Sequence, residues 1–193
     1  MKDKALMLNK AIIGSLIINE NGKFYNRLVF AMPDGAIQYY DKRHLFTHSG
    51  EDEYYTRGKQ RVIINYLGWR VCPLICYDLR FPVWSSNRND YDLLIYVANW
   101  PQKRHNVWEI LPHARAIENQ SYVSVVNRIG KDNQGVVHAG YSRNIDYNGK
   151  IIDKASLDGE EIVTSTFAFD KLHEFRKKFD FISDADPFGV FIQ

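Results

Sequence analysis

The stretch VCPLICYDLRFP, residues 71–82, places a cysteine at the end of a short apolar run and follows it with Tyr-Asp-Leu-Arg. The run has the length and composition of a buried β-strand. The residues after it predict a turn into a short helix, so we expect Cys76 at a rim, near free backbone N–H groups. Such groups lower the pKa of a thiol and can stabilise an oxyanion. A small buried position is the commoner environment of a lone cysteine, and it suits Cys72 inside the run.

The chain on either side of this stretch predicts a layered α/β fold, in which helices cover sheets. Residues 92–100 are almost continuously apolar, which is typical of a strand covered on both faces. Apolar residues recur at helical spacing over 107–120, where Pro112 removes one backbone hydrogen bond. The other predicted elements are helices at 1–10 and 171–179, strands at 11–19, 24–32, 36–42, 61–67, 71–76, 121–129 and 164–170, a hairpin over 136–152 with its turn at Asn148-Gly149, a loop over 44–59 and an extended end from 184.

Length and composition limit the class of protein. A chain of 193 residues favours one domain, and 45% hydrophobic with 25% charged residues is ordinary for a globular protein. A net charge of +2 is too small to indicate nucleic acid or an anionic membrane as a partner. No apolar run approaches the ~20 residues of a membrane span, and the N-terminus lacks the plan of a signal peptide. We therefore expect a cytoplasmic protein.

The two cysteines, Cys72 and Cys76, predict neither a disulfide nor a metal site. On one extended strand they would lie about 13 Å apart, whereas a disulfide needs Cα atoms within about 7 Å. Two cysteines alone cannot build a zinc site, and no histidine pair lies near them at ligand spacing. Cys76 is thus a free thiol that needs another explanation.

A nucleophilic cysteine needs a base. The chain has six histidines, none in a recognisable catalytic context, and a cysteine–histidine pair cannot be deduced from one sequence. The alternative is a carboxylate base together with a lysine that stabilises charge. Lys42 ends the strand YYDK and is a candidate for that lysine, although an exposed lysine at a strand end is the simpler interpretation.

Six segments in order make the sequence recognisable: YDKRHLF, a glutamate a few residues later, GWRVCPLICYDLRFP, YVANWP, ARAIENQSYV and VNRIG. Together they resemble the nitrilase superfamily of carbon–nitrogen hydrolases, and most closely its omega-amidase branch. The resemblance runs from about Lys10 to Phe179. It implies a four-layer αββα sandwich, a Cys-Glu-Lys triad, no cofactor or metal, and a homodimer.

The resemblance also implies roles for individual residues. Cys76 matches the nucleophile, Lys42 the lysine that stabilises the oxyanion, and Glu51 a second, supporting carboxylate, with Glu53 as its rival in the same loop. The other expected roles are an oxyanion-hole N–H from Tyr77, a substrate carboxylate site at Arg80, a pocket rim at Asn99 and Trp100, and structural support from Arg115, Glu118 and Asn119.

One part of the family pattern has no match here. The catalytic glutamate of relatives lies on an early strand, upstream of the helix with which this chain starts, and Glu20 and the acidic cluster at 51–53 come too late to match it. We expect residues 1–193 to form a single carbon–nitrogen hydrolase domain that is N-terminally truncated, lacking its first strands, a helix and this base. A fragment or a misplaced start would explain this, and the missing layers would expose apolar surface.

The predicted function is that of an amidase. It would hydrolyse a non-peptide C–N bond of a small ω-amido acid through a cysteine thioester and release ammonia. The alternative is a catalytically impaired remnant that acts only by folding or binding, since the base is missing. A papain-like hydrolase is a weak third hypothesis, because no histidine context supports it. The expected partner is a small-molecule amide, with no nucleic acid and no membrane.

Overall fold

The computed structural model describes residues 1–189, and the N-terminal part forms a helix and an antiparallel sheet. Helix α1 (Lys2–Leu8) is followed by β1 (Ile12–Glu20), β2 (Lys23–Ala31) and β3 (Ile37–Asp41), which pair in the order β1-β2-β3. Asn21 and Gly22 join β1 to β2 with φ of 53° and 77°. Positive φ at both positions is what a two-residue type I′ hairpin turn requires, and Asn-Gly meets it with little strain. The predicted helix and three-stranded meander are confirmed.

The second sheet has six strands in the order β11-β10-β7-β6-β5-β4. Its centre is three parallel strands, β5 (Trp69–Ile75), β6 (Leu93–Ala98) and β7 (Tyr122–Asn127). The outer face of these strands packs in the core with α4, and β5 and β6 also pack against the small sheet through Val71 and Ile95, which explains their apolar sequences. The antiparallel strands beside them are β4 (Ile64–Tyr66), β10 (Arg143–Ile145) and β11 (Ile151–Lys154).

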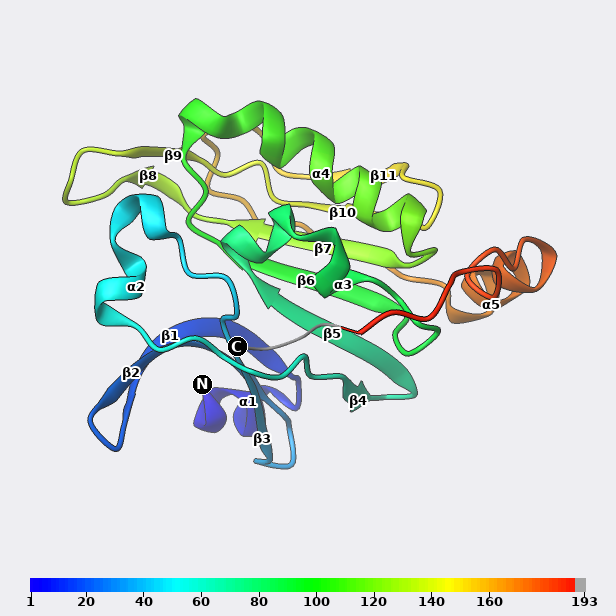
Figure 1. Ribbon diagram of the computed structural model, residues 1–193, viewed down its shortest axis with the longest axis horizontal. Helices are drawn as coiled ribbons and strands as arrows, with labels where there is room; N and C mark the ends of the chain where they lie inside the picture. The colour runs from blue at the N-terminus through cyan, green and yellow to red at the C-terminus, as the bar shows by residue number, and fades with distance from the viewer. Residues whose placement is uncertain (190–193) are drawn as a thin grey trace.

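The two sheets pack face to face with helices outside them, as Figure 1 shows. Helix α4 (His105–Glu118) covers the outer face of the six-stranded sheet, and its Trp108 is buried there. Between the sheets, Phe30 packs in one cluster with Ile64, Val71 and Ile95. On the far side of the small sheet, Ala5 of α1 is buried with residues of β2. The predicted four-layer αββα sandwich is confirmed.

The expected loop over 44–59 is wrong in part. It contains a 3₁₀ turn, η1 (Thr47–Ser49), and one helical turn, α2 (Glu51–Tyr54), separated by Gly50 at φ 71°. Single turns are too short to produce a hydrophobic period, so no sequence pattern indicated them. The short helix predicted after Cys76 is present as η2 (Cys76–Arg80) and α3 (Pro82–Ser85).

The expected hairpin over 136–152 and the expected strand over 164–170 also differ from the structure. Strand β9 (Val137–Ala139) pairs with β8 (Ile129–Lys131), and only β10 and β11 form a hairpin across Asn148-Gly149. Residues 164–168 form no strand, and α5 (Phe169–Lys178) begins within the segment. Contacts with Tyr122 hold residues 164–168 in place instead. The Ala168 N–H donates to the Tyr122 hydroxyl at 3.2 Å, and the Phe167 ring packs 4.7 Å from the Tyr122 ring. The predicted extended end is irregular after a turn at 182–185, and 190–193 lie outside the described residues.

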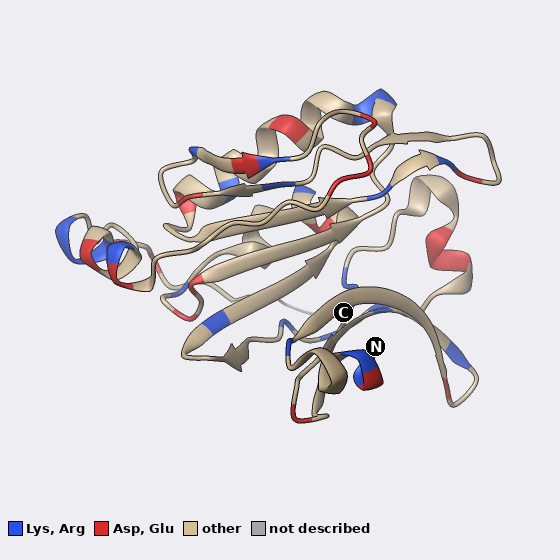
Figure 2. Cartoon of the chain, turned by 180° about the vertical axis from the view of Figure 1, so that it is seen from behind, with Lys and Arg blue, Asp and Glu red and all other residues tan. Residues whose placement is uncertain are grey.

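The surface agrees with the absence of a strong charge pattern in the sequence. Figure 2 shows Lys and Arg interspersed with Asp and Glu over the side in view. Several apolar side chains of α1 and β1 are exposed: Leu6, Met7, Leu8, Leu16 and Ile17. Within residues 1–189, no helix has the length and apolar character that crossing a membrane requires.

Helix α4 contains Pro112, and Arg143 of β10 compensates for it. Proline has no N–H, so the carbonyl of Trp108, four residues earlier, loses its partner in the helix. The buried Arg143 guanidinium donates to that Trp108 carbonyl and, at 2.9 Å, to the Glu109 carbonyl. A long-range hydrogen bond thus replaces a helical one and ties the outer helix to the sheet.

We expect Arg143→Met to lower the free energy of unfolding by about 2–4 kcal/mol, because it leaves a buried carbonyl without a donor. Adding Pro112→Ala should recover about 1 kcal/mol, since the new N–H satisfies that carbonyl. Urea unfolding of both variants measures these changes. Arg57→Met, at an exposed arginine, is the matched control and should change little. Equal stability of Arg143→Met and the unchanged chain would contradict the compensation.

Candidate active site

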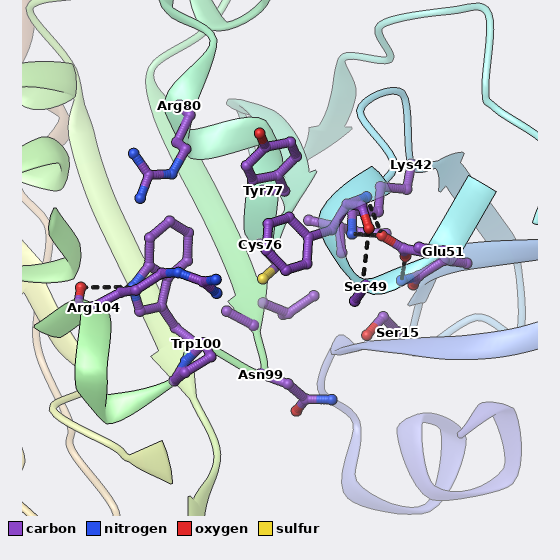
Figure 3. Close-up of a pocket in the computed structure, with 16 residues that line it drawn as sticks. Ser15, Lys42, Ser49, Glu51, Cys76, Tyr77, Arg80, Asn99, Trp100 and Arg104 are labelled. Atoms are coloured by element: carbon purple, nitrogen blue, oxygen red, sulfur yellow. Dashed lines mark hydrogen bonds and ion pairs between the residues drawn. The ribbon is translucent and has the colours of Figure 1, made fainter. Parts of the chain in front are cut away.

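The residues that the sequence singled out for chemistry meet in one pocket of about 220 Å³ (Figure 3). The pocket lies where β5 and β6 end and where the chain between β3 and α2 crosses from the small sheet. All seven predicted site residues line it: Lys42, Glu51, Cys76, Tyr77, Arg80, Asn99 and Trp100. The other lining residues are Ser15, Asn26, Phe46, Ser49, Ile75, Val97, Ala98, Pro101 and Arg104.

Cys76 follows the last residue of β5 and has a φ of 45°, in the left-handed region that a residue with a side chain rarely adopts. Asp78 holds this bend. Its carboxylate accepts hydrogen bonds from the Ile75 N–H at 3.0 Å and from the Tyr40 hydroxyl at 2.8 Å. It also accepts from the His44 N–H at 3.0 Å. The strained turn is therefore fixed from both sheets, and it presents the thiol to the pocket.

The pKa of Cys76 differs from the sequence expectation. Burial raises it, and this effect exceeds the opposing effects of the Lys42 charge and of a hydrogen bond from the Asn99 backbone. The backbone N–H of Asn99 lowers the pKa as expected, but desolvation of the thiolate outweighs this one bond, so the net shift is upward. The resting thiol is neutral near pH 7, so its attack on a substrate requires a proton acceptor.

Lys42 and Glu51 form a buried ion pair with 2.6 Å between Nζ and Oε2. The Glu51 carboxylate also accepts from the Phe46 N–H at 2.6 Å and from the Asn26 side chain at 3.0 Å. Burial alone would raise the pKa of Glu51, but the Lys42 charge and these hydrogen bonds outweigh it and lower the pKa. Glu53, the rival in the loop, is exposed and does not line the pocket.

The backbone around Lys42 is held on both sides. Its N–H donates to the Asn26 carbonyl, and its carbonyl accepts from the Gly58 N–H, both at 2.9 Å. Gly58 passes so close to β3 that a Cβ there would lie 2.0 Å from the Asp41 carbonyl oxygen. Only glycine fits this crossing, and the ammonium group is thereby fixed at the pocket wall.

Asn99 and Trp100, the expected rim residues, both form hydrogen bonds through their backbone N–H groups. Asn99 approaches the thiol with its N–H. Trp100 donates its N–H to the Asn127 side chain at 2.7 Å and its indole Nε1 to the Arg104 carbonyl at 2.9 Å. Arg80 is exposed and lies over the Trp100 ring, 5.4 Å from its centre.

The residues expected to support the fold lie outside the pocket. Arg115 donates to the Leu79 carbonyl at 2.7 Å and pairs with Glu118 at 2.8 Å. Asn119 accepts from the Asn87 N–H at 2.7 Å. These contacts fix the chain just after Cys76 against α4.

Sequence reasoning missed several pocket residues, notably Asn26, Phe46 and Arg104. Asn26 lies on a strand of mixed polarity, and the other two lie in segments without a period, so no local signal distinguished them. None of the histidines lines the pocket; His44 instead stacks on Phe81 and places Nδ1 2.8 Å from Asp78. Over residues 1–189, no three His, Cys, Asp or Glu side chains gather where they could hold a metal ion.

Comparison with known proteins defines the class. The carbon–nitrogen hydrolase family matches residues 1–177, so the chain belongs to that family. Within it, the chain lies in the omega-amidase branch of the nitrilase superfamily. It is 45% identical over 190 residues to omega-amidase YafV of Escherichia coli K12, across 98% of this chain and 74% of that protein. It is 32% identical to 2-oxoglutaramate amidase of Bacillus subtilis, across 90% of this chain and 67% of the relative.

Solved structures agree with the fold. XC1258 of Xanthomonas campestris, a CN-hydrolase superfamily protein with an arsenic adduct in its active site, is 40% identical with a TM-score of 0.95, across 98% of this chain and 74% of that one. Nit3 of Saccharomyces cerevisiae is 26% identical with a TM-score of 0.83, across 92% of this chain and 67% of that one. The predicted family, branch and fold are confirmed. The predicted N-terminal truncation stays a prediction.

We expect iodoacetamide to alkylate Cys76 faster than Cys72 near neutral pH. Cys72 is fully buried and burial raises its pKa to about 12, whereas Cys76 faces the pocket. Because the pKa of Cys76 is also above its ordinary value, its alkylation rate should keep rising above pH 9, and Lys42→Met should shift the profile to still higher pH. Both cysteines lie on the tryptic peptide 71–80, so tandem mass spectrometry that locates the label within this peptide measures both rates, with Lys131→Met as the control. Equal rates at the two cysteines would contradict this assignment.

Proposed function

We propose that the chain hydrolyses the amide of a small ω-amido acid through a thioester on Cys76 and releases ammonia. One observation carries the proposal: a thiol on a strained turn, a buried lysine–glutamate pair and the Arg80 guanidinium share one pocket. The 45% identity to an omega-amidase supports the same activity.

The proposed reaction has two halves. The Cys76 sulfur attacks the amide carbon after its proton passes to a carboxylate base, and Lys42 with the Tyr77 N–H stabilises the oxyanion. The base returns the proton to the nitrogen, the C–N bond breaks and ammonia leaves. The same base then removes a proton from water, which attacks the thioester carbon, and the thiol is restored.

The substrate class follows from the charged groups of the pocket. Arg80 can form a bidentate ion pair with a substrate carboxylate, which favours an acidic amide. Asn99 and Trp100 bound the space between this cation and the thiol. A short ω-amido acid would place its amide at Cys76 and its carboxylate at Arg80.

A second candidate is a chain that binds such an amide without turning it over. Among the described residues, Glu51 is the one carboxylate that lines the pocket. Its oxygens already accept from Lys42, Phe46 and Asn26, and its pKa is lowered, so it is a poor proton acceptor. Without another base, general base catalysis worth about 10²–10⁴-fold would be lost.

Two further parts of the expectation stay predictions: cytoplasmic location and a homodimer. The exposed apolar side chains of α1 and β1, among them Met7 and Ile17, support self-association.

Ammonia release from 2-oxosuccinamate tests the two candidates. The arms are the 193-residue chain, Cys76→Ala, Cys72→Ala as the matched cysteine control, and a longer version that adds an upstream strand with a glutamate. We expect slow turnover by the chain and by Cys72→Ala, about 10²–10⁴-fold below the longer version, because Glu51 is a poor base. We expect a further loss of at least about 10³-fold in Cys76→Ala, because the nucleophile is removed.

The remaining outcomes separate the candidates. Turnover by the longer version alone would support the Cys76 mechanism and leave the 193-residue chain as a binding protein. Turnover that survives in Cys76→Ala would show that the thiol is not the nucleophile. Inactivity of both lengths would contradict the proposed substrate.

A further inference from the structure

The pocket contains a second arginine that the proposed reaction does not use. Arg104 ends η3 (Gln102–Arg104), and its side chain lines the pocket on the same side of Cys76 as Arg80, away from the Lys42–Glu51 pair (Figure 3). Over residues 1–189, neither guanidinium has a carboxylate within ion-pair distance. The polar groups Ser15 and Ser49 lie on the Glu51 side of the thiol.

Both guanidinium groups are held by aromatic rings. Arg104 lies over Phe46, 4.8 Å from the ring centre, and Arg80 lies over Trp100 at 5.4 Å. Stacking restrains the plane of a guanidinium and leaves its N–H edge free for a planar anion. The two groups are therefore positioned cations without an anion.

The backbone of Arg104 is fixed as well. Its N–H donates to the Pro101 carbonyl at 3.0 Å, and its carbonyl accepts from the Trp100 indole at 2.9 Å. Phe46 belongs to the segment between Lys42 and Glu51, and its N–H donates to Glu51. Arg104 thus spans the pocket from the six-stranded sheet to the segment that positions the catalytic ion pair.

We propose that Arg104 is a specificity-determining residue that, together with Arg80, binds the anionic end of a 2-oxo acid amide. The inference rests on the proposed function and adds Arg104 as a second cation at the carboxylate site assigned to Arg80. A carboxylate with an adjacent carbonyl presents three oxygens in or near one plane, which suits two guanidinium edges. A 2-amino acid amide would instead place an ammonium group beside two cations, so this site discriminates against it.

Binding of product-like dicarboxylates tests the proposal without requiring turnover. Calorimetric titration of the 193-residue chain uses three probes: 2-oxoglutarate, glutamate and neutral butyramide. The variants are Arg104→Met, Arg104→Lys and Lys103→Met. Lys103 is the exposed neighbour on η3 that does not line the pocket, so its replacement controls for the loss of one positive charge.

We expect Arg104→Met to weaken 2-oxoglutarate binding by at least about 10-fold and to narrow the preference for 2-oxoglutarate over glutamate, while butyramide binding is unchanged. Arg104→Lys should lie between, because a lysine keeps the charge and loses the planar fork. Lys103→Met should change each affinity less than about 2-fold.

Three results would overturn the proposal: unchanged 2-oxoglutarate affinity in Arg104→Met, an equal loss for butyramide, or no binding of 2-oxoglutarate by the unchanged chain. The titrations measure binding and the ammonia assay measures turnover, so a negative result in one does not imply a negative result in the other. Tight anion binding without turnover therefore refutes the reaction and leaves the anion site standing.

Discussion

The buried carboxylate of Asp78 is the contact on which the site depends. It is fully inaccessible, and its two oxygens receive the Ile75 N–H, the Tyr40 hydroxyl, and the N–H and Nδ1 of His44. Ile75 precedes Cys76 and ends β5 of the large sheet, whereas Tyr40 lies on β3 of the small sheet and His44 lies in the segment that follows it, on either side of Lys42. Burying a carboxylate without hydrogen-bond donors would lower the stability of the fold by several kcal/mol, so the folded chain requires these four contacts. One side chain thereby sets the distance between thiol and ammonium.

Burial in the sandwich favours the protonated form of both Cys76 and Glu51, but the two groups end with opposite net pKa shifts. Burial raises the pKa of the Cys76 thiol, whereas the Lys42 charge keeps the pKa of Glu51 low. The pocket thus holds a neutral nucleophile beside an ionised, fully hydrogen-bonded carboxylate. Such a pair needs a further proton acceptor to react, and it provides in Lys42 a fixed cation for the oxyanion.

Local patterns predicted those parts of the protein that depend on neighbouring residues. The apolar run before Cys76, the Asn-Gly turns and the helical spacing of 107–120 each express a local preference, and the structure has them. The segment 164–170 has strand composition, yet Tyr122 and Ser165 anchor it by side-chain bonds, so it joins no sheet. The two turns of the 44–59 segment are too short to show a period. No local pattern distinguished Arg104, because its partner Phe46 is distant in the sequence.

The alternation of strands and helices, the family motifs and the candidate residues Cys76, Lys42 and Glu51 could be predicted from the amino-acid sequence alone. These depend on residue type and order, which a sequence shows directly. Only the tertiary structure decided the direction of the Cys76 pKa, the pairing of Lys42 with Glu51, the replacement of a helical hydrogen bond by Arg143, and the placement of two unpaired guanidinium groups over aromatic rings. Desolvation and charge proximity arise from residues that folding brings together from separate elements, and no local pattern specifies them.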